Sequence, residues 1–518
     1  MSYSKELATT FTDTRLRTPN NLCEVSGMCS TCSDDCTGIC EIGLSAVRGG
    51  EATYPYNTSN QQFASEKKYP FDYSHFNING RVFGAIGAEE DSEKVNVNSV
   101  NLSCEIGYDK KIKLKAPIIL PAIAKLNWRD YYSGAAIAGV IAVIGESAIK
   151  SDVELQHDNK GKVLYAPLLN EMVHCFRKYD RGYGDIVLQV NADDIAVGTP
   201  EYALANCDIK TLEIKLGQGA KGIQHFAPVY SYDEAVSLKK KGYLIEPDPL
   251  DDNVKKEYFN NEFSYFIQYG RLPMWNEGII AKMVNRYRCL GAENIFFKMA
   301  GYDIEDIQRV LQIASDNKIA LVTFDGAGGG TGHSPCKMMN EWGHPTIELE
   351  KIVCEIINDL KNEGKYIPAI AIAGGITMED NIFKVLAIGA PYVKVAGIGR
   401  GAMAAAMVAK NIGEMIEKGN VPPKYRCYGE KSDDIFREEK RIKKMYDNIK
   451  DKIPLGAIGV YSYIDRLSTG LRLFMTLNRK FDLKYINQKD VIPLTNDAKR
   501  YIKDLENVII NNYDNKSM

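Results

Sequence analysis

Eight short apolar runs alternate with helical stretches through the middle of this 518-residue chain. The runs are apolar at successive positions, which is the pattern of parallel strands buried on both faces. They cover 117–123, 139–145, 185–190, 211–216, 294–300, 320–325, 369–374 and 392–397. Helical patterns cover 130–138, 168–180, 199–206, 276–290, 303–316, 345–363, 378–388 and 402–418. Alternating strands and helices predict a parallel α/β fold, and eight strands with eight connections predict a (β/α)8 barrel of the TIM type.

The remaining residues are arranged around this barrel, which we place at 116–420. Residues 1–45 form a cysteine-rich segment, and the polar, Asn- and Gly-rich residues 46–115 predict a wrapping or linker segment with a few short strands. Residues 421–518 predict a helical C-terminal extension that begins with a charged helical stretch over 432–452. Because 77 residues separate the fourth and fifth runs, more than one helix needs, we expect an insertion over 222–275 that forms an ordered lid on the catalytic face.

Charge and hydropathy exclude some classes of partner. Lys and Arg number 64 against 67 Asp and Glu, for a net charge of -3, so the basic excess typical of a nucleic-acid-binding protein is absent. The longest apolar stretch, 135–144, has about ten residues, where a membrane-spanning helix needs about 20. No apolar signal segment follows Met1. We expect a cytoplasmic protein with no nucleic-acid or membrane partner, as a single chain or a homo-oligomer.

Two glycine turns follow the last two predicted strands. Gly374 and Gly375 end the seventh, while Gly397, Gly399, Arg400 and Gly401 end the eighth. Loops after these two strands commonly form the phosphate site of such a barrel, because glycine lets backbone N–H groups approach an anion closely. Arg400 can pair with phosphate oxygens through its two-pronged guanidinium. The alternative is a pair of tight turns with no ligand.

A third glycine-rich stretch follows the sixth strand. Five of the seven residues 326–332 are glycines, among them Gly329 and Gly330, and the sixth position of this stretch is Thr331. We expect this run to bring backbone close to something flat or charged rather than to fill a core, with a plain flexible loop as the alternative. His333 and Cys336 follow it directly.

Polar residues stand where strands three to five end. They are Gln189 and Asn191, then Lys215, Gln218 and Lys221, and finally Lys298 within the fifth strand. A buried lysine is costly without an anionic partner, and either a bound anionic group or a neighbouring carboxylate, such as Glu213 or Asp325, would supply one. We also consider His225 and His333 as general acids, Cys336 as a proton donor and Glu146 as a residue that orients substrate. A loop histidine that is merely hydrogen-bonded, and a buried free cysteine, are the alternatives.

Three motifs in chain order resemble the FMN-binding barrel of glutamate synthase, in particular its short, archaeal-type relatives. They are KLGQGAKG at 215–222, the DGxxGGTG core at 325–332 and LAIGAPYVKVAGIGRG at 386–401. The resemblance covers roughly 115–415. It implies FMN at the carboxyl end of the barrel, its phosphate on the last two loops, Gln189, Lys215, Gln218 and Lys298 toward the flavin, and 328–332 toward the substrate. A lysine can stabilise the negative charge of a reduced flavin ring.

The chain also departs from that family. Ser2 stands where glutamine-using members carry a nucleophilic cysteine, and no glutaminase domain is present. The loop after the second strand reads GESA (145–148) in place of GEGG, and 401–411 lacks the iron–sulfur cysteines that follow strand eight in that family. The flavin site therefore carries over better than the sites for 2-oxoglutarate and ammonia.

Five cysteines lie within 23–40, outside the barrel. Cys29, Cys32, Cys36 and Cys40 follow one another at x2, x3 and x3 spacing, and Cys23 precedes them. Closely spaced thiolates of this kind hold iron–sulfur clusters, whereas structural zinc usually needs two CxxC-like knuckles. We expect a [4Fe–4S] cluster on those four residues, with zinc, free thiols or a disulfide as alternatives.

These features predict an FMN- and iron–sulfur-dependent oxidoreductase that acts on the C–N bond of an amino or imino acid. No GxGxxG motif follows a strand that opens a βαβ unit, so we expect electrons to pass to or from a partner protein such as a ferredoxin or a flavoprotein subunit. The alternatives are a flavin enzyme for a different amine or a C=C substrate, and an electron-transfer subunit of a larger complex.

Overall fold

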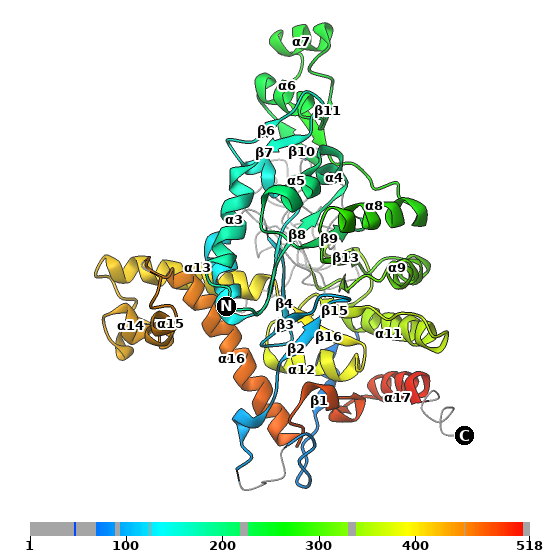
Figure 1. The fold of residues 1–518 in the computed structure, drawn as a ribbon, viewed down its shortest axis with the longest axis vertical. Coiled ribbons are helices and arrows are strands. Elements are labelled where there is room, and N and C mark those ends of the chain that lie inside the picture. Colours follow the sequence, from blue (N-terminus) through cyan, green and yellow to red (C-terminus); the bar gives the residue numbers. More distant parts are fainter. Residues whose placement is uncertain are drawn as a thin grey trace, which may run out of the picture.

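The central fold is a closed barrel of eight strands in the order β13-β14-β15-β16-β4-β5-β8-β9 (Figure 1). The computed structural model describes residues 46–47, 69–88, 94–123, 126–217, 226–329, 338–449 and 451–510. Every neighbouring pair in the barrel is parallel. The strands are β4 (Ile118–Ile123), β5 (Ile141–Ile144), β8 (Ile186–Val190), β9 (Thr211–Lys215), β13 (Asn294–Ala300), β14 (Leu321–Asp325), β15 (Ala369–Ala373) and β16 (Val393–Gly397). The predicted (β/α)8 barrel is confirmed.

Helices cover the outside of the barrel where the sequence pattern predicts them. They are α2 (Trp128–Ala138), α3 (Pro167–Arg177), α5 (Thr199–Asn206), α8 (Glu277–Cys289), α9 (Ile304–Asp316), α11 (Thr346–Asn362), α12 (Glu379–Ile388) and α13 (Arg400–Glu417). Helix α9 shows why: the Asp303 side chain accepts a hydrogen bond from the Glu305 N–H at its start, which satisfies a free donor of the first turn. Its buried residues, among them Ile307 and Leu311, recur at helical spacing.

The two ends of the barrel interior differ in character. A cluster of buried apolar side chains includes Val143, Val187 and Phe296 from the strands. The hairpin of β2 (Cys104–Ile106) and β3 (Ile112–Leu114) adds three apolar side chains to this same cluster, Ile106, Ile112 and Leu114. The strand ends on the carboxyl side carry buried polar residues instead, among them Glu213 and Lys298. The interior is therefore apolar at one end and charged at the other.

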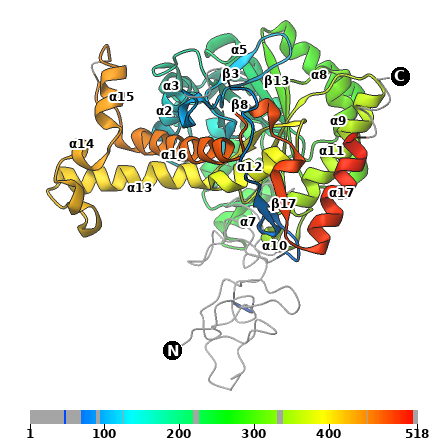
Figure 2. The ribbon, with the colours of Figure 1, turned by 90° about the horizontal axis from the view of Figure 1, so that it is seen from below.

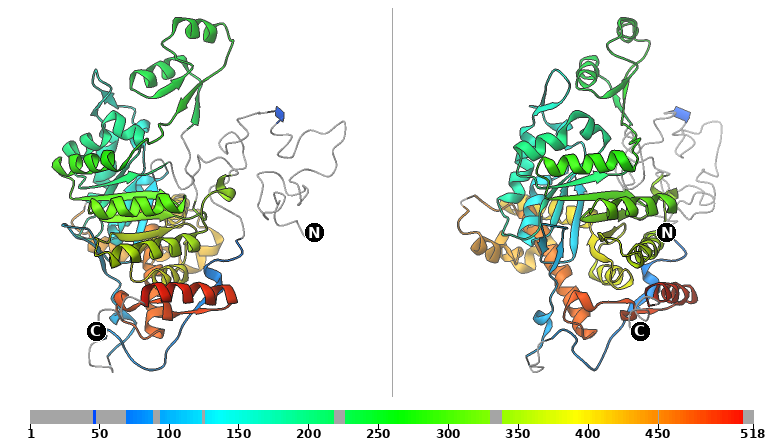
Figure 3. Two further views of the ribbon diagram at one scale, coloured as in Figure 1. Left: turned by 90° about the vertical axis from the view of Figure 1, so that its right-hand side faces the viewer. Right: turned by 45° about the vertical axis from the view of Figure 1, so that its right-hand side comes forward.

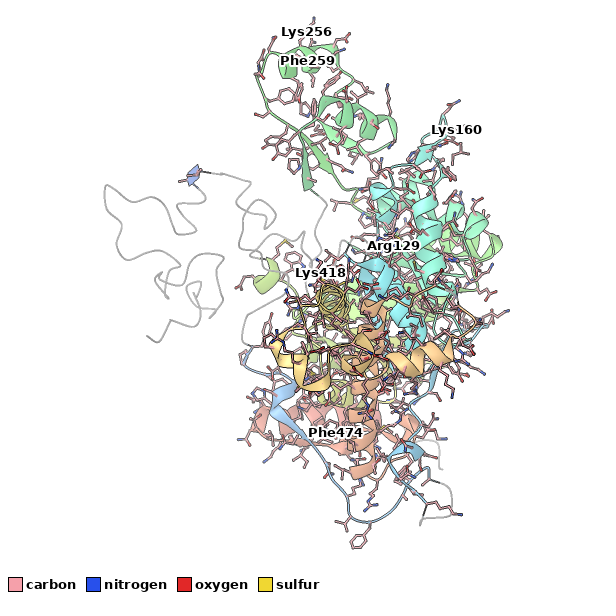
Figure 4. The ribbon with its side chains drawn as sticks, turned by 90° about the vertical axis from the view of Figure 1, so that its left-hand side faces the viewer. Arg129, Lys160, Lys256, Phe259, Lys418 and Phe474 are labelled. Carbon is pink, nitrogen blue, oxygen red and sulfur yellow. The ribbon has the colours of Figure 1, made fainter. Side chains whose placement is uncertain are left out.

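An antiparallel sheet projects from the barrel between β9 and β13. Its strands, in the order β10-β12-β11, are β10 (Phe226–Val229), β12 (Phe266–Tyr269) and β11 (Leu244–Glu246), with helices α6 (Tyr232–Lys240) and α7 (Asp252–Phe259). Aromatic rings of Tyr232, Tyr258, Phe263 and Phe266 pack against one another and give it a small core of its own. Figure 4 shows Lys256 and Phe259 at its far end, away from the barrel. The domain boundaries and the role as a lid stay predictions.

The C-terminal extension packs on the barrel through a long helix, α16 (Leu455–Leu477), which runs beside α13 (Figure 2). Small residues allow close approach: a Cβ at Gly134 of α2 would lie 2.5 Å from the Val460 Cβ, and one at Gly459 would lie 2.3 Å from the Ala409 Cβ. The predicted charged helical stretch over 432–452 contains two short helices. The chain forms α14 (Ser432–Ile435) and α15 (Glu439–Met445), because Phe436 between them has a non-helical ψ of 88°.

The described parts of the two flanking regions meet. Strand β1 (Phe76–Ile78) pairs antiparallel with β17 (Val491–Pro493), which precedes α17 (Asn496–Ile510). Figure 3 shows β1 and α17 at the same end of the molecule, below the barrel helices. The short strands expected before residue 115 thus exist, and one of them binds to the C-terminal extension. Among the described helices, none combines the length and the apolar character needed to cross a lipid bilayer.

Candidate active site at the carboxyl end of the barrel

Strand register places the predicted polar residues in two adjacent pairs, two residues apart along the strands. Gln189 of β8 lies opposite Glu213 of β9, and Lys215 of β9 lies opposite Lys298 of β13. The Gln189 Nε2 donates a hydrogen bond of 2.6 Å to Glu213 Oε1. Both side chains are buried, so the carboxylate depends on protein partners in place of water.

Lys298 forms a buried ion pair with the next strand. Its Nζ lies 2.9 Å from Asp325 Oδ2 at the end of β14, so the carboxylate partner that we considered from the sequence is present. Burial lowers the pKa of Lys298, but Asp325 and Glu213 outweigh it and the net pKa is raised. Burial raises the pKa of Glu213, against the opposing effect of Lys298. Lys298 is therefore a fixed cation within the barrel mouth.

A second ion pair crosses the mouth from β9 to the loop after β5. The Lys215 Nζ contacts Glu146 Oε2, and Lys215 is buried. Glu146 had been expected to orient substrate or flavin, and in the structure its partner is one of the predicted flavin lysines. The mouth thus holds two buried lysines, each with a carboxylate from a neighbouring loop or strand end.

The turn that carries Glu146 is held by Asp194, a residue that the sequence did not predict to belong to the site. Ser147 has a left-handed φ of 57°, a conformation that glycine adopts most readily, at the position where the resembling family has glycine. Its N–H donates to Asp194 Oδ2 at 3.0 Å, and Asn191 Nδ2 lies 3.4 Å from its hydroxyl. Burial raises the pKa of Asp194 to about 6. Asn191 and Asp194 cap the start of the following helix reciprocally. Their spacing in the sequence was the one signal that could have predicted a role for Asp194 here.

The loops after β15 and β16 leave open space beside their glycines. Gly374 and Gly375 have φ of 118° and 81°, and a Cβ added at Gly375 or at Gly399 would meet no atom within 4 Å. Gly399 precedes Arg400, the exposed first residue of α13. The N–H groups of a first helical turn lack partners within their helix and attract anions. This cradle can accept a phosphate group.

The glycines after β14 serve a different purpose from the one expected. A Cβ at Gly326 would lie 2.3 Å from Thr346 Oγ1, and one at Gly328 would lie 3.0 Å from the Gly374 carbonyl oxygen. Thr346 Oγ1 also donates to that carbonyl oxygen at 2.9 Å. Gly326 and Gly328 therefore allow two loops and the start of α11 to touch, a packing role that the sequence did not predict. The expected approach of this run to a flat or charged group stays a prediction. Gly329 is the last described residue here.

Several predicted residues lie outside the described part of the chain. They are Gln218, Lys221, His225, Gly330, Thr331, His333 and Cys336 in the predicted barrel segment, and Cys29, Cys32, Cys36 and Cys40 in the cysteine segment. Within the described ranges, no group of three or more His, Cys, Asp or Glu side chains is placed to hold a metal ion. The cluster prediction concerns other residues and stays a prediction.

Comparison with known proteins agrees with part of this interpretation. Residues 274–411 match the model described as the conserved region in glutamate synthase; they run from before α8 into α13 and include β13 to β16, hence Lys298, Asp325 and the glycine cradle. No curated protein sequence matches the chain. The match supports a relationship to glutamate synthase over this segment.

Solved structures of similar fold share little sequence with the chain. A lactate oxidase (putative) from Pediococcus acidilactici has 13% identity and a TM-score of 0.44, over 82% of this chain and 84% of that chain. The flavin-binding domain of baker's yeast flavocytochrome b2 has 12% identity and 0.44, over 82% and 78%. A soluble mutant of (S)-mandelate dehydrogenase from Pseudomonas putida has 13% and 0.43, over 81% and 88%. These likenesses are too distant to inform the chemistry of the site.

Proposed function

We propose that the protein is an FMN- and iron–sulfur-dependent oxidoreductase related to glutamate synthase, acting on the C–N bond of an amino or imino acid. One observation carries the proposal. Two buried lysines, Lys215 and Lys298, stand in the mouth of a parallel barrel whose last two loops form an open glycine cradle. Lys298 and the glycine cradle lie within the segment that matches glutamate synthase, and Lys215 precedes it.

The residues present fit FMN. The open space at Gly375 and Gly399, with the start of α13 and Arg400, suits its phosphate. Lys298 is buried and paired with Asp325 at the end of β14, and its positive charge would favour the negative charge of a reduced flavin ring. Bound there, FMN would take up two electrons as a hydride and release them one at a time. Gln189, Gln218 and Lys221 complete our proposed flavin contacts, with Gly329, Gly330 and Thr331 toward the substrate.

The Glu146–Lys215 pair suits a substrate that carries both a carboxylate and an amine or imine. Lys215 attracts the carboxylate and Glu146 attracts a positively charged nitrogen, so the same pair can bind both ends of the reacting group. His225 and His333 are the proposed proton donors to the substrate nitrogen. A neutral substrate would have to break the pair without offering a charge in return, which disfavours it.

The cysteine segment supplies the electron route in this proposal. Four thiolates at Cys29, Cys32, Cys36 and Cys40 suit a [4Fe–4S] cluster. A cluster of this kind carries one electron, and its natural counterpart is a small redox protein such as a ferredoxin or a flavoprotein subunit.

Anaerobic purification followed by measurement of flavin, iron and acid-labile sulfide tests the proposal. We expect close to one FMN and about four irons per chain, as a [4Fe–4S] centre requires. Reduced protein should then be reoxidised by 2-oxoglutarate with ammonium, and oxidised protein should be bleached by L-glutamate. Protein that binds neither FMN nor iron after reconstitution would overturn the proposal.

A second candidate keeps the flavin and changes the substrate. It is favoured by Ser147, whose hydroxyl and neighbouring Asn191 amide stand beside Glu146 where the resembling family has a bare glycine. Bleaching by another amine, with none by L-glutamate, would support this candidate.

A further inference from the structure

Two consecutive buried aspartates connect the projecting sheet to the mouth of the barrel. Asp193 and Asp194 begin the short helix α4 (Ala192–Val197), directly after β8. Each is almost fully buried. Their carboxylates point to different structures, since Asp193 binds Arg271 of the insertion and Asp194 binds the turn after β5.

Asp194 fixes the turn that carries Glu146. Its Oδ2 accepts hydrogen bonds from the Ser147 N–H at 3.0 Å and from the Asn191 N–H at 3.2 Å. Ser147 has a left-handed backbone φ of 57°, which residues other than glycine rarely adopt. The turn therefore needs an external contact to hold it. Because Glu146 precedes Ser147 directly, the same contact sets the direction from which Glu146 reaches Lys215.

Asp193 fixes the base of the insertion to the same helix start. The Arg271 Nη1 lies 2.7 Å from Asp193 Oδ1, and the Arg271 N–H donates to Asp193 Oδ2 at 3.3 Å. Arg271 also donates to the Gly242 carbonyl oxygen. The adjacent Tyr243 ring lies 4.6 Å from the Lys150 Nζ. The insertion is thus attached to the loops of both β5 and β8.

We infer that Asp194 is a positioning residue for the Glu146–Lys215 pair, and that Asp193 makes this positioning depend on the insertion. Any substrate or protein that shifts the insertion would then act on the ion pair through two adjacent residues. The consequence for catalysis rests on the proposed function, but the positioning of the pair does not.

The charged and titratable groups around Asp194 are Glu146 and Lys150 from the β5 side, Asp193 and Arg271 at the insertion, and the rings of Tyr243 and Tyr287. Burial raises the pKa of Asp194 to about 6, with a smaller contribution from the negative charge of Glu146, while the two N–H donors and Lys150 lower it. Asp194 therefore loses its charge, and with it a strong hydrogen bond to Ser147, as the pH falls below about 6.

Two measurements on the full-length protein test whether Asp194 positions the Glu146–Lys215 pair, and neither requires a substrate or a flavin. Amide hydrogen exchange reports the Ser147 N–H, and the rate of amine acetylation, followed by mass spectrometry, reports whether Lys215 is paired. In Asp194→Ala we expect both rates to rise about tenfold, the size expected for a lost hydrogen bond to a charged group. Acetylation of Lys215 should approach its rate in Glu146→Gln.

Conservative and control variants separate positioning from general damage. Asp194→Asn keeps a neutral acceptor for Ser147, so its exchange and acetylation rates should fall between those of wild type and Asp194→Ala, even where Asp194→Ala folds poorly. Asp158 also accepts two backbone N–H groups, from Lys160 and Lys162, but on an exposed turn, so Asp158→Ala should leave Lys215 unchanged.

Arg271→Ala tests the connection to the insertion, and should raise Lys215 acetylation by a smaller factor than Asp194→Ala. Unchanged exchange at Ser147 and unchanged acetylation of Lys215 in Asp194→Ala would overturn the inference. Absence of FMN from the wild-type protein would instead overturn the proposed function and leave this result intact.

Discussion

The two ends of the barrel interior differ in what their side chains do: one end stabilises the fold, and the other gathers charges. At the amino end, the β2–β3 hairpin places Ile106, Ile112 and Leu114 in an apolar cluster, and burial of apolar surface stabilises the fold there. At the carboxyl end, two lysines, three carboxylates and an open glycine cradle occupy the same interior. Buried charges contribute little net stability because their desolvation is costly. A cluster of such charges beside an open glycine cradle indicates that the carboxyl end is arranged for binding.

Of the variants considered, removal of the Lys298 charge should have the largest effect on the stability and activity of the protein. Lys298→Met leaves Asp325 and Glu213 buried without their cation, which costs about 3–5 kcal/mol for a broken buried pair. Flavin reduction should fall by about 1000-fold, within the range for loss of a preorganised charge. Denaturant unfolding and stopped-flow absorbance measure the two effects.

The control is the surface pair of Lys178 and Asp451, which are 2.6 Å apart. Lys178→Met should cost less than about 1 kcal/mol, because water solvates the freed aspartate. Equal losses in the two variants would remove the distinction between a functional buried pair and an ordinary one.

Shortening a buried apolar side chain at the amino end of the barrel should lower the stability of the protein without changing flavin binding. Leu114 is fully buried, and Leu114→Ala should lower the free energy of unfolding by about 2–5 kcal/mol through lost burial and a cavity. FMN affinity of the remaining folded protein should stay within twofold of wild type. A parallel loss of flavin would show that the two ends are not separate.

The pH dependence of stability should change when Asp194 is replaced. Burial raises the folded-state pKa of Asp194 from 3.8 to about 6, so folding favours its protonated form. This contribution is present in full below the unfolded pKa near 4 and is lost as the pH rises through about 6. Relative to Asp194→Asn, wild type should gain about 3 kcal/mol between pH 7 and pH 4, from about two units at 1.36 kcal/mol each. Urea unfolding of both proteins across this range measures it, and parallel curves would show that Asp194 is not perturbed.

A methyl group added to the glycine cradle should give the smallest change in free energy of these variants, and the change should be confined to FMN affinity. A Cβ at Gly399 meets no protein atom within 4 Å, so Gly399→Ala should leave stability almost unchanged. FMN affinity should fall about tenfold, or about 1.4 kcal/mol, if phosphate occupies that space. Gly80 has equally open surroundings far from the mouth, and Gly80→Ala should leave FMN affinity unchanged.

The barrel was predictable because its signals are local. Each strand begins within two residues of its predicted run, since a strand buried on both faces must be apolar throughout. Lys298 stood out for the same reason, as one charge within the seven buried residues of β13. Gln189 and Lys215 were predicted from their places at the ends of those runs.

Contacts between distant segments were not predictable in this way. The pairing of β1 with β17 joins residues near 77 and near 492, and no local pattern encodes it. The contact between Asp194 and Ser147 depends on how two loops pack, so no local pattern predicts it. The packing role of Gly326 likewise required the position of Thr346.

Titration of flavin-free protein with FMN and with riboflavin, which lacks the phosphate, tests the central claim most directly. The glycine cradle and the start of α13 predict one FMN per chain and riboflavin binding weaker by about 100-fold, a difference of about 2.7 kcal/mol. Equal affinity for the two flavins would contradict the phosphate site. No binding of either would contradict the assignment of the carboxyl end as a flavin site.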